Sequence, residues 1–323
     1  MSERKQIGLI SLGVMGQRML ARLAEHARVR ALVAWDPNPA AVEQVRARYP
    51  DLRIAATAAE VIATTGLDCL YIASPPASHL AYAEQGFDAG LAVFSEKPLT
   101  VDFAAGREAI ARIETERRRA AVNFSLASSP GLAAMQAAIT DASIGKPQRV
   151  EIELGFERWP RSWQAAAGRW LAERAEGGFA REVLSHFIFV LQRALGPAAV
   201  EQAQPDYPAD GVSSERALTA RLQAGGLPVA IEARVGGSHP DFNRMTLSGT
   251  AGALEIHDWF GVRRRRGGGD WTALGTAQGN RQIGQTAQLD QLAAMIAGEA
   301  HTLPGFAEAL AVQQTIEALL QGR

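Results

Sequence analysis

The tripeptide Glu96-Lys97-Pro98 places a titratable amine directly after a buried apolar run. A lysine at the mouth of such a strand has a flexible stem, and burial can lower the pKa of its ammonium group. The proline behind it fixes the backbone and limits where the amine can point. Lys97 is therefore a candidate for stabilising negative charge on a reacting oxygen. A surface Glu–Lys pair before a turn is the alternative interpretation of the tripeptide alone.

Glu182 and His186 form a second candidate pair, because they are four residues apart in a segment predicted to be helical. Residues at that spacing share one face of a helix. An imidazole titrates near neutrality, and a neighbouring carboxylate can fix its tautomer and stabilise the imidazolium ion. His186 is therefore a candidate general base. Because apolar residues follow it at 187–189, a buried core histidine is the open alternative.

A βαβ unit with small residues at its first turn begins the chain. Apolar runs predict strands at 6–11 and 29–35, and residues 17–25 have helical periodicity. The turn reads Ser11-Leu12-Gly13-Val14-Met15-Gly16, with serine at the first position of the G-x-G-x-x-G pattern. Small residues let the backbone approach a pyrophosphate at the helix N-terminus. We expect these six residues to bind a dinucleotide; an ordinary tight turn is the alternative.

Asp36 ends the second strand, where a carboxylate can accept hydrogen bonds from both ribose hydroxyls. It would repel a 2′-phosphate, so we expect NAD as the cofactor, with NADP less favoured. Further contacts are expected where later strands end, because strand ends line the ligand crevice of an open parallel sheet. The expected cofactor contacts beyond the turn and Asp36 are Ser74, Pro75, Pro76, His79, Glu96, Lys97 and Asn123.

The hydrophobic pattern changes from one half of the chain to the other. Up to about residue 123, buried strands alternate with helices, which predicts a doubly wound parallel sheet. From Val150 to Phe156, apolar and polar residues alternate with a period of two, and turns at 225–226 and 249–252 separate similar runs. This pattern is typical of an antiparallel sheet with one wet face. Two helices are expected to end the chain.

Composition excludes several other classes of protein. The 323 residues suggest two domains, and 47% hydrophobic with 21% charged residues is typical of a globular enzyme. A net charge of −1 predicts no general attraction to nucleic acid or membrane surfaces. The single Cys69 indicates a reducing compartment, and we expect a cytoplasmic protein without signal peptide or membrane span. Scattered histidines give no metal-ligand spacing.

Together these motifs resemble the glucose–fructose oxidoreductase / inositol dehydrogenase / MocA (Gfo/Idh/MocA) family. The resemblance spans most of the chain in order and rests on the following residues: the Ser11–Gly16 turn, Asp36, Ser74-Pro75-Pro76 with His79, Ala89-Gly90, Glu96-Lys97-Pro98-Leu99, Asn123, Gly177-Gly178 and His186. It implies an α/β protein, with an NAD(P)-binding Rossmann domain at 1–123. An α+β domain with a large, mostly antiparallel sheet would follow at 124–323 and serve substrate binding and oligomerisation.

The resemblance implies an oxidoreductase that interconverts a hydroxyl and a carbonyl on a sugar, polyol or related small molecule. Hydride transfer from an alcohol carbon releases a proton, which a group with a pKa near neutrality accepts best. The expected catalytic residues are Lys97, His186 and Glu182. The family's substrate-facing loop adds Trp163, Arg169 and Trp170 as expected substrate contacts, since indole faces stack on sugars and arginine binds carboxylates. Alternatively, these tryptophans cover the sheet or a subunit interface.

Several residues depart from the family pattern. Glu182 stands where an aspartate is typical, Leu184 where a glycine is common, and Phe189 where an aspartate is often found. The arginine usual after Asn123 is missing. These changes imply a less polar pocket and leave three alternatives open: an NAD-assisted glycoside hydrolase, a C=N (imine) reductase, and a non-catalytic nucleotide-binding protein. An uncovered sheet face often becomes a subunit interface, so we expect a homodimer or homotetramer.

Overall fold

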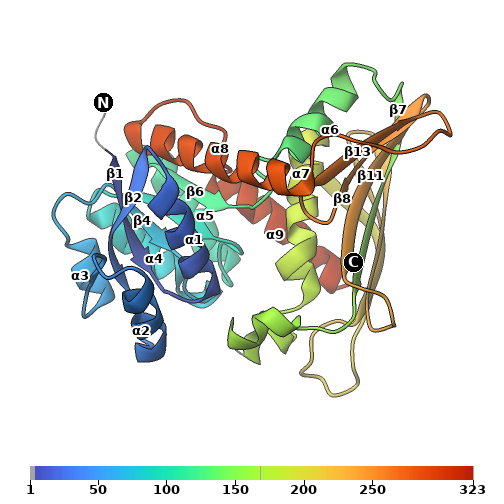
Figure 1. Cartoon of the computed structure of the whole chain (residues 1–323). Helices are drawn as coiled ribbons and strands as arrows, with labels where there is room; N and C mark the ends of the chain where they lie inside the picture. The colour runs from blue at the N-terminus through green and yellow to red at the C-terminus, as the bar shows by residue number, and fades with distance from the viewer. Residues whose placement is uncertain (1–3, 168, 323) are drawn as a thin grey trace. The chain divides into compact units, whose positions relative to one another are not determined.

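The structure is a computed structural model that describes residues 4–167 and 169–322; the side chains of 165–167 and 169 lie outside the description. Two compact units make up the described chain (Figure 1). Unit 1 comprises the residues up to Phe124 together with Gln285–Leu310. Unit 2 comprises Ser125–Gly284 and the residues from 311 onward. The sequence predicted a single domain boundary after residue 123. In the structure, a second segment of unit 1, Gln285–Leu310, follows most of unit 2 in the sequence.

Unit 1 contains a parallel sheet whose neighbours run β3-β2-β1-β4-β5-β6. Its strands are β1 (Lys5–Ile10), β2 (Val29–Trp35), β3 (Arg53–Ile54), β4 (Cys69–Ile72), β5 (Ala92–Glu96) and β6 (Ala120–Asn123). The strand order reverses between β1 and β4, and ligands of doubly wound sheets bind at that switch point. The predicted parallel sheet is confirmed, and it brings the ends of β1, β4 and β5 side by side.

Helices connect these strands and bury the apolar faces of the sheet. They are α1 (Val14–Glu25), α2 (Pro39–Arg48), α3 (Ala58–Ile62), α4 (His79–Asp88) and α5 (Phe103–Glu116). The part of α8 (Ala277–Ala297) from residue 285 onward belongs to the same unit. Its apolar stripe, including Leu289, Leu292 and Ile296, joins one core with Ile7 of β1 and Met19 of α1. Distant parts of the sequence therefore share the core of unit 1.

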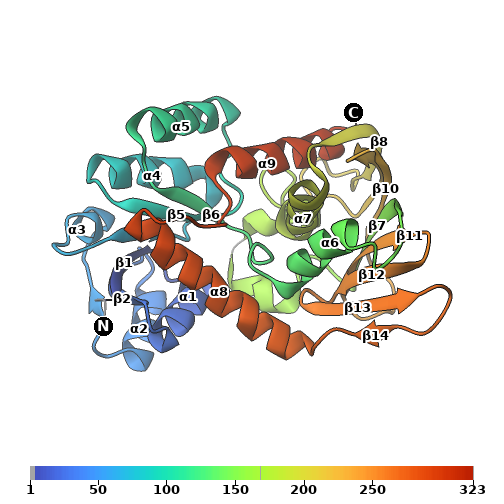
Figure 2. The same cartoon turned by 90° about the horizontal axis from the view of Figure 1, so that it is seen from above.

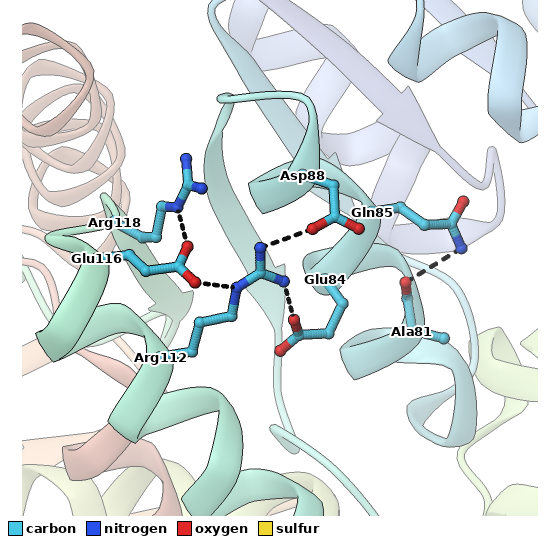
Figure 3. Close-up of polar contacts among 7 residues, drawn as sticks. All are labelled: Ala81, Glu84, Gln85, Asp88, Arg112, Glu116 and Arg118. Atoms are coloured by element: carbon cyan, nitrogen blue, oxygen red, sulfur yellow. Dashed lines mark hydrogen bonds and ion pairs between the residues drawn. The ribbon is translucent and has the colours of Figure 1, made fainter.

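A charged network joins α4 and α5 on the surface of unit 1 (Figure 3). Arg112 of α5 donates to the carboxylates of Glu84 and Asp88 on α4, at 2.6 Å for Asp88 Oδ1. Its Nε donates to Glu116 Oε1 at 3.0 Å, and its guanidinium lies 5.7 Å from the centre of the Phe87 ring. One guanidinium thus joins three carboxylates across two helices.

Unit 2 contains a second sheet with the order β14-β13-β12-β11-β7-β10-β9-β8. Its strands are β7 (Pro147–Phe156), β8 (Ala198–Asp206), β9 (Ala217–Ala224), β10 (Leu227–Val235), β11 (Phe242–Gly249), β12 (Gly252–His257), β13 (Gly261–Arg266) and β14 (Thr272–Ala273). The β7–β10 pair is parallel, and the other neighbouring pairs are antiparallel. The predicted mostly antiparallel sheet is confirmed, as are its hairpin turns at 225–226 and 249–252; in the second, the strands include Gly249 and Gly252, so residues 250–251 form the loop.

Helices α6 (Pro130–Thr140), α7 (Ser185–Leu195) and the end of α9 (Phe306–Leu320) lie on one face of this sheet (Figures 1 and 2). Gly131 of α6 packs against Ile256 of β12, so alternate residues of the strands point to the other face. That face carries two ion pairs, Arg244–Glu153 and Arg263–Glu255, and no helix of the described chain covers it. Among the described residues, no helix combines the length and apolarity that crossing a membrane requires.

Candidate functional site: a dinucleotide cradle and two buried glutamates

The turn between β1 and α1 has the geometry of a phosphate cradle. Ser11 has a left-handed backbone with φ of 79°, a conformation that glycine adopts more readily. A Cβ on Gly16 would overlap the Ser11 carbonyl oxygen, so the close approach of helix and strand requires glycine there. Gly13 is exposed and caps α1; a Cβ on it would meet Ser11 Oγ at 3.7 Å, an ordinary contact. Packing within the protein therefore does not require a glycine at position 13.

Asp36 closes over this turn from the end of β2. Its Oδ2 accepts hydrogen bonds from the Leu12 amide at 2.6 Å and from Ser11 Oγ at 3.1 Å. Its Oδ1 accepts from the Asn38 amide at 2.7 Å. The carboxylate therefore stabilises the strained turn, a role that the sequence did not predict. Val14 and Met15, two other predicted contacts, are half-buried in the first turn of α1.

His79 connects the ends of β4 and β5. It is the first residue of α4 and is buried, with Nε2 2.7 Å from the Ser74 carbonyl oxygen and Nδ1 2.8 Å from the Pro98 carbonyl oxygen. A neutral imidazole can donate to one of these oxygens, and a protonated ring can donate to both. The predicted contacts Ser74 and His79 thus meet the loop that carries Lys97. Pro75 and Pro76 lie between them, where the strand has ended.

Glu96 is the buried last residue of β5 and the centre of a polar network. Tyr71 of β4 and Asn123 of β6 both donate to its Oε1, the latter at 2.6 Å. Gln288 of α8 donates to Asn123 Oδ1 at 2.8 Å and to the Phe124 carbonyl at 3.1 Å. The network joins three adjacent strands and a helix from the far end of the sequence. It fixes the strand end from which Lys97 follows.

Burial governs the ionisation of this network. Loss of solvation raises the pKa of Glu96, while the hydrogen bonds from Tyr71 and Asn123 and the charge of Lys97 oppose that rise. Burial also raises the pKa of the Tyr71 phenol, and the adjacent Glu96 adds to the effect. Tyr71 therefore remains a hydrogen-bond donor at ordinary pH. Lys97 itself is half-buried, beside a cis peptide bond to Pro98.

Unit 2 holds the other predicted catalytic pair. Glu182 lies in a π-helical turn, Ala180–Leu184, which leads directly into α7 and its second residue, His186. The expected helix therefore begins as a π-turn, a feature often found at functional sites. His186 is buried, and its ring meets Trp259 edge-on at a centroid distance of 5.2 Å. The buried position agrees with the core alternative as well as with a desolvated base.

The loop before the π-turn carries the predicted substrate contacts. Trp163 is 45% exposed, and the Arg161 guanidinium lies 4.7 Å from the centre of its ring. Trp170 is half-buried, and the side chain of Arg169 lies outside the described residues. Trp159 Nε1 donates to the Leu171 carbonyl at 2.9 Å, which ties the loop to itself. Trp163 is therefore more exposed than Trp159 and Trp170 of the same loop.

Sequence reasoning missed three residues of these sites. Tyr71 and Gln288 complete the network around Glu96, and Glu215 of unit 2 accepts a hydrogen bond from the first residue of the π-turn, Ala180. A polar residue within the apolar stripe of α8 was the one available signal for Gln288. No group of three or more His, Cys, Asp or Glu side chains in the described chain is arranged to hold a metal ion.

Comparison with known proteins agrees with this architecture. The family described as "Oxidoreductase family, NAD-binding Rossmann fold" (GFO_IDH_MocA) matches residues 5–124. Inositol 2-dehydrogenase of Rhizobium meliloti is 27% identical over 148 residues, 46% of this chain and 44% of that protein. Inositol 2-dehydrogenase of Acidothermus cellulolyticus is 31% identical over 145 residues, 44% of this chain and 42% of that protein. The chain thus matches less than half the length of these curated relatives.

Among solved structures, an oxidoreductase from Agrobacterium radiobacter in complex with NAD+, L-tartaric acid and magnesium is similar at a TM-score of 0.85. The two chains are 16% identical, and the similarity covers 99% of this chain and 96% of the other. At that identity the likeness establishes the fold. The fold and the family match define an NAD-binding Rossmann domain in residues 5–124. Residues 5–124 therefore match the Gfo/Idh/MocA family model, the family that the motifs of the sequence resemble.

Proposed function

We propose that this protein is an NAD-dependent oxidoreductase that interconverts a hydroxyl and a carbonyl on a polyol, sugar or related small molecule. The observation that carries the proposal is the exposed Gly13 backbone at the N-terminus of α1, where the protein has no packing reason for glycine. A pyrophosphate requires that close approach, and free helix amides favour its charge. The two relatives described above are inositol 2-dehydrogenases, which supports a polyol-like substrate.

Asp36 supports NAD over NADP. Two of its hydrogen bonds come from the turn and one from Asn38, which leaves acceptor capacity on a carboxylate with about four lone-pair sites. Ribose hydroxyls would use that capacity, and a 2′-phosphate would be repelled. When bound, NAD would supply the hydride acceptor; the residues of the chain would bind and orient it.

Two side chains are assigned roles in the proton and charge movements. Lys97 would stabilise negative charge on the reacting oxygen, held by a strand end that the Glu96 network fixes. His186 would accept the hydroxyl proton at an imidazole nitrogen, with Glu182 favouring its protonated form. Replacing His186 by Ala should lower kcat about a hundredfold or more while NADH binding persists, and replacing Lys97 by Met should lower kcat by a similar factor.

Trp163 supports a substrate with an apolar C–H face. Its exposed indole, backed by Arg161 at 4.7 Å, is a stacking surface suited to a cyclic polyol or sugar. The proposal includes a homodimer or homotetramer formed through the open face of the unit 2 sheet, in the cytoplasm. Light scattering tests the assembly, and a monomeric mass would refute it. Cell fractionation tests the location.

Calorimetric titration with NADH and NADPH is the first experiment, using the wild type, Gly13→Ala and Gly305→Ala. Gly305 is the matched control, since a Cβ there meets nothing within 4 Å and it lies in the same unit. We expect NADH to bind more tightly than NADPH, and Gly13→Ala alone to weaken binding. Equal binding by Gly13→Ala and the wild type would refute the cradle.

A substrate screen follows with NAD and polyols, sugar acids and glycosides. Net formation of NADH from a polyol or sugar acid supports the proposal. Release of a glycoside's leaving group without net NADH would instead establish the NAD-assisted hydrolase. NADH binding without turnover of any alcohol, glycoside or imine would favour the non-catalytic alternative.

A further inference from the structure

A buried carboxylate in unit 2 lies outside every role assigned so far. Glu215 immediately precedes Arg216 and β9, and its side chain is almost completely buried. Oε1 accepts a hydrogen bond from the Ala180 amide at 2.7 Å, while Oε2 is buried without a hydrogen-bond partner. A buried carboxylate oxygen left without a donor is costly to the folded state. A glutamate at position 215 therefore requires an explanation in the structure around it.

Gly178 shows how closely this carboxylate meets the chain. A Cβ at Gly178 would overlap both carboxylate oxygens of Glu215, and the residue has φ of 101°. Glycine is therefore required here for both space and conformation. The Gly178 carbonyl in turn accepts from the Glu182 amide at 3.1 Å. Gly178, the Glu215 carboxylate and the start of the π-turn are therefore in direct contact with one another.

Charged groups hold the same segment from its other side. Arg181 donates to both carboxylate oxygens of Glu317 in α9, at 2.6 and 2.8 Å, and to the Gly177 carbonyl at 2.8 Å. The charge of Glu215 also acts on Tyr207, whose ring centre lies 3.8 Å from the guanidinium carbon of Arg174. Ala180 is thus anchored by Glu215, and the next residue by Glu317.

This anchored segment is the π-turn that leads into α7. Widening a helix to i→i+5 hydrogen bonds is rare, and such turns persist where surrounding structure imposes them. Ser185 Oγ donates to the Arg181 carbonyl at 2.7 Å, which ties the end of the π-turn to its start. Glu182 lies inside the turn and His186 follows directly after it. The direction of both side chains therefore depends on where the turn begins.

We propose that Glu215 is a positioning residue that fixes the first amide of the π-turn and thereby orients Glu182 and His186. The inference rests on the proposed function in one respect, that His186 acts on the substrate. Burial supports it by raising the pKa of Glu215 to about 7, against the opposing effects of the Ala180 hydrogen bond and the Arg181 charge; the Glu317 charge adds to the rise. The carboxyl group therefore changes charge in the range where His186 would work.

Three replacements separate the hydrogen bond from the charge. Glu215→Gln keeps an acceptor for the Ala180 amide and removes the charge. Glu215→Asp keeps the charge and withdraws the acceptor by one methylene. Glu215→Ala removes both. Leu222→Ala is the control, since Leu222 is buried on the same unit's β9 and its loss should destabilise without touching the π-turn.

The readouts are hydrogen exchange of peptide 177–186, the NMR titration of the His186 ring, and kcat with the Kd for NADH. The ring signal is assigned by its loss in His186→Ala. We expect Glu215→Asp and Glu215→Ala to speed exchange, to shift the His186 titration, and to lower kcat about ten- to a hundredfold with an unchanged Kd. Glu215→Gln should restore protection and most of kcat, and Leu222→Ala should leave the ring titration unchanged.

An unchanged exchange rate and ring titration in Glu215→Asp would overturn the inference, whether or not Glu215→Ala folds. Equal effects of Leu222→Ala on the ring would also overturn it, because they would indicate general destabilisation. The proposed function fails separately: a wild type that shows no turnover, while Glu215→Asp still shifts the His186 ring, would remove the oxidoreductase assignment and keep the positioning role.

Discussion

Glu96 in unit 1 and Glu215 in unit 2 are both buried, yet their surroundings differ. Two side chains donate to Glu96, and a second layer through Gln288 supports one of them. Glu215 has one backbone donor and one oxygen without a partner. Burial raises the pKa of both, and for Glu215 it reaches about 7.

The difference shows two ways of holding a chain segment. A complete network, as around Glu96, makes a strand end rigid and gives it a fixed place in the sheet. A half-satisfied carboxylate, as at Glu215, fixes a single amide and remains sensitive to pH. Glu96 directly precedes Lys97 in the chain, and Glu215 accepts a hydrogen bond from the first residue of the π-turn that contains Glu182.

Breaking the complete network should give the largest effect. Asn123→Leu removes a donor from Glu96 and leaves the Gln288 amide facing an apolar group, so we expect a loss of about 3 kcal/mol in unfolding free energy. Urea denaturation followed by circular dichroism measures it. Gln288→Leu disturbs the outer layer alone and should cost about 1 kcal/mol. Equal losses in the two variants would contradict a network centred on Glu96.

The half-satisfied carboxylate should reveal itself through pH. The pKa of Glu215 is about 7 when folded against a usual 4.5, so the folded state binds the extra proton between those values. Stability from this group is full below about pH 4.5 and is lost as pH rises through 7. Glu215→Gln should match the wild type near pH 5 and exceed it by on the order of 3 kcal/mol at pH 8.

Urea midpoints at several pH values test this difference. Glu232→Gln on β10 is the control, since that side chain is exposed and its removal should leave the wild-type pH dependence in place. A Glu215→Gln variant whose stability falls between pH 5 and 8 as steeply as that of the wild type would contradict the assignment.

The fold could be predicted further than the sites. Period-two alternation and apolar runs located most strands of both sheets, because each pattern depends on neighbouring residues, but β3, β8 and β14 were not predicted. Glu96 and Asn123 were predicted as cofactor contacts because strand ends line the crevice, and that role stays a prediction. Their hydrogen bond to each other appeared only in the structure. Gln288 could not be placed, because 165 residues separate it from Asn123. Glu215 stands in a polar run, Ser213 to Arg216, which is typical of an exposed turn rather than of a buried anchor.

The π-turn escaped prediction for a related reason. A helix with i→i+5 hydrogen bonds over one turn leaves the apolar pattern of 183–191 almost unchanged. What imposes the turn is Glu215 and Glu317, both far along the chain from Arg181. Asp36 was predicted as a ribose ligand. Its hydrogen bonds to Ser11 and Leu12 could be identified only from the structure. The NAD preference stays a prediction.

The two tight turns offer a smaller test of the comparison. Unit 2 uses glycine at the left-handed position 178, whereas unit 1 uses Ser11, with φ of 79°, at the start of its cradle. Ser11→Gly should relieve about 1 kcal/mol of backbone strain, and Ser11→Ala should keep the strain while losing the Asp36 contact. Thermal midpoints should rank Gly above Ala. The reverse order would mean that side-chain packing, not backbone strain, governs the turn.

The smallest effect is expected where charge lies at the surface instead of in a core. Arg112 joins three carboxylates of α4 and α5 (Figure 3), and these pairs raise its pKa above the usual value. Because the groups are solvated, salt screens their attraction. Arg112→Met should lower the thermal midpoint slightly in low salt and match the wild type at 1 M NaCl, with NADH binding unchanged throughout. The Asn123→Leu loss should persist at 1 M NaCl, because buried hydrogen bonds are screened much less. If salt abolished both losses, the contrast between a buried network and a surface one would fail.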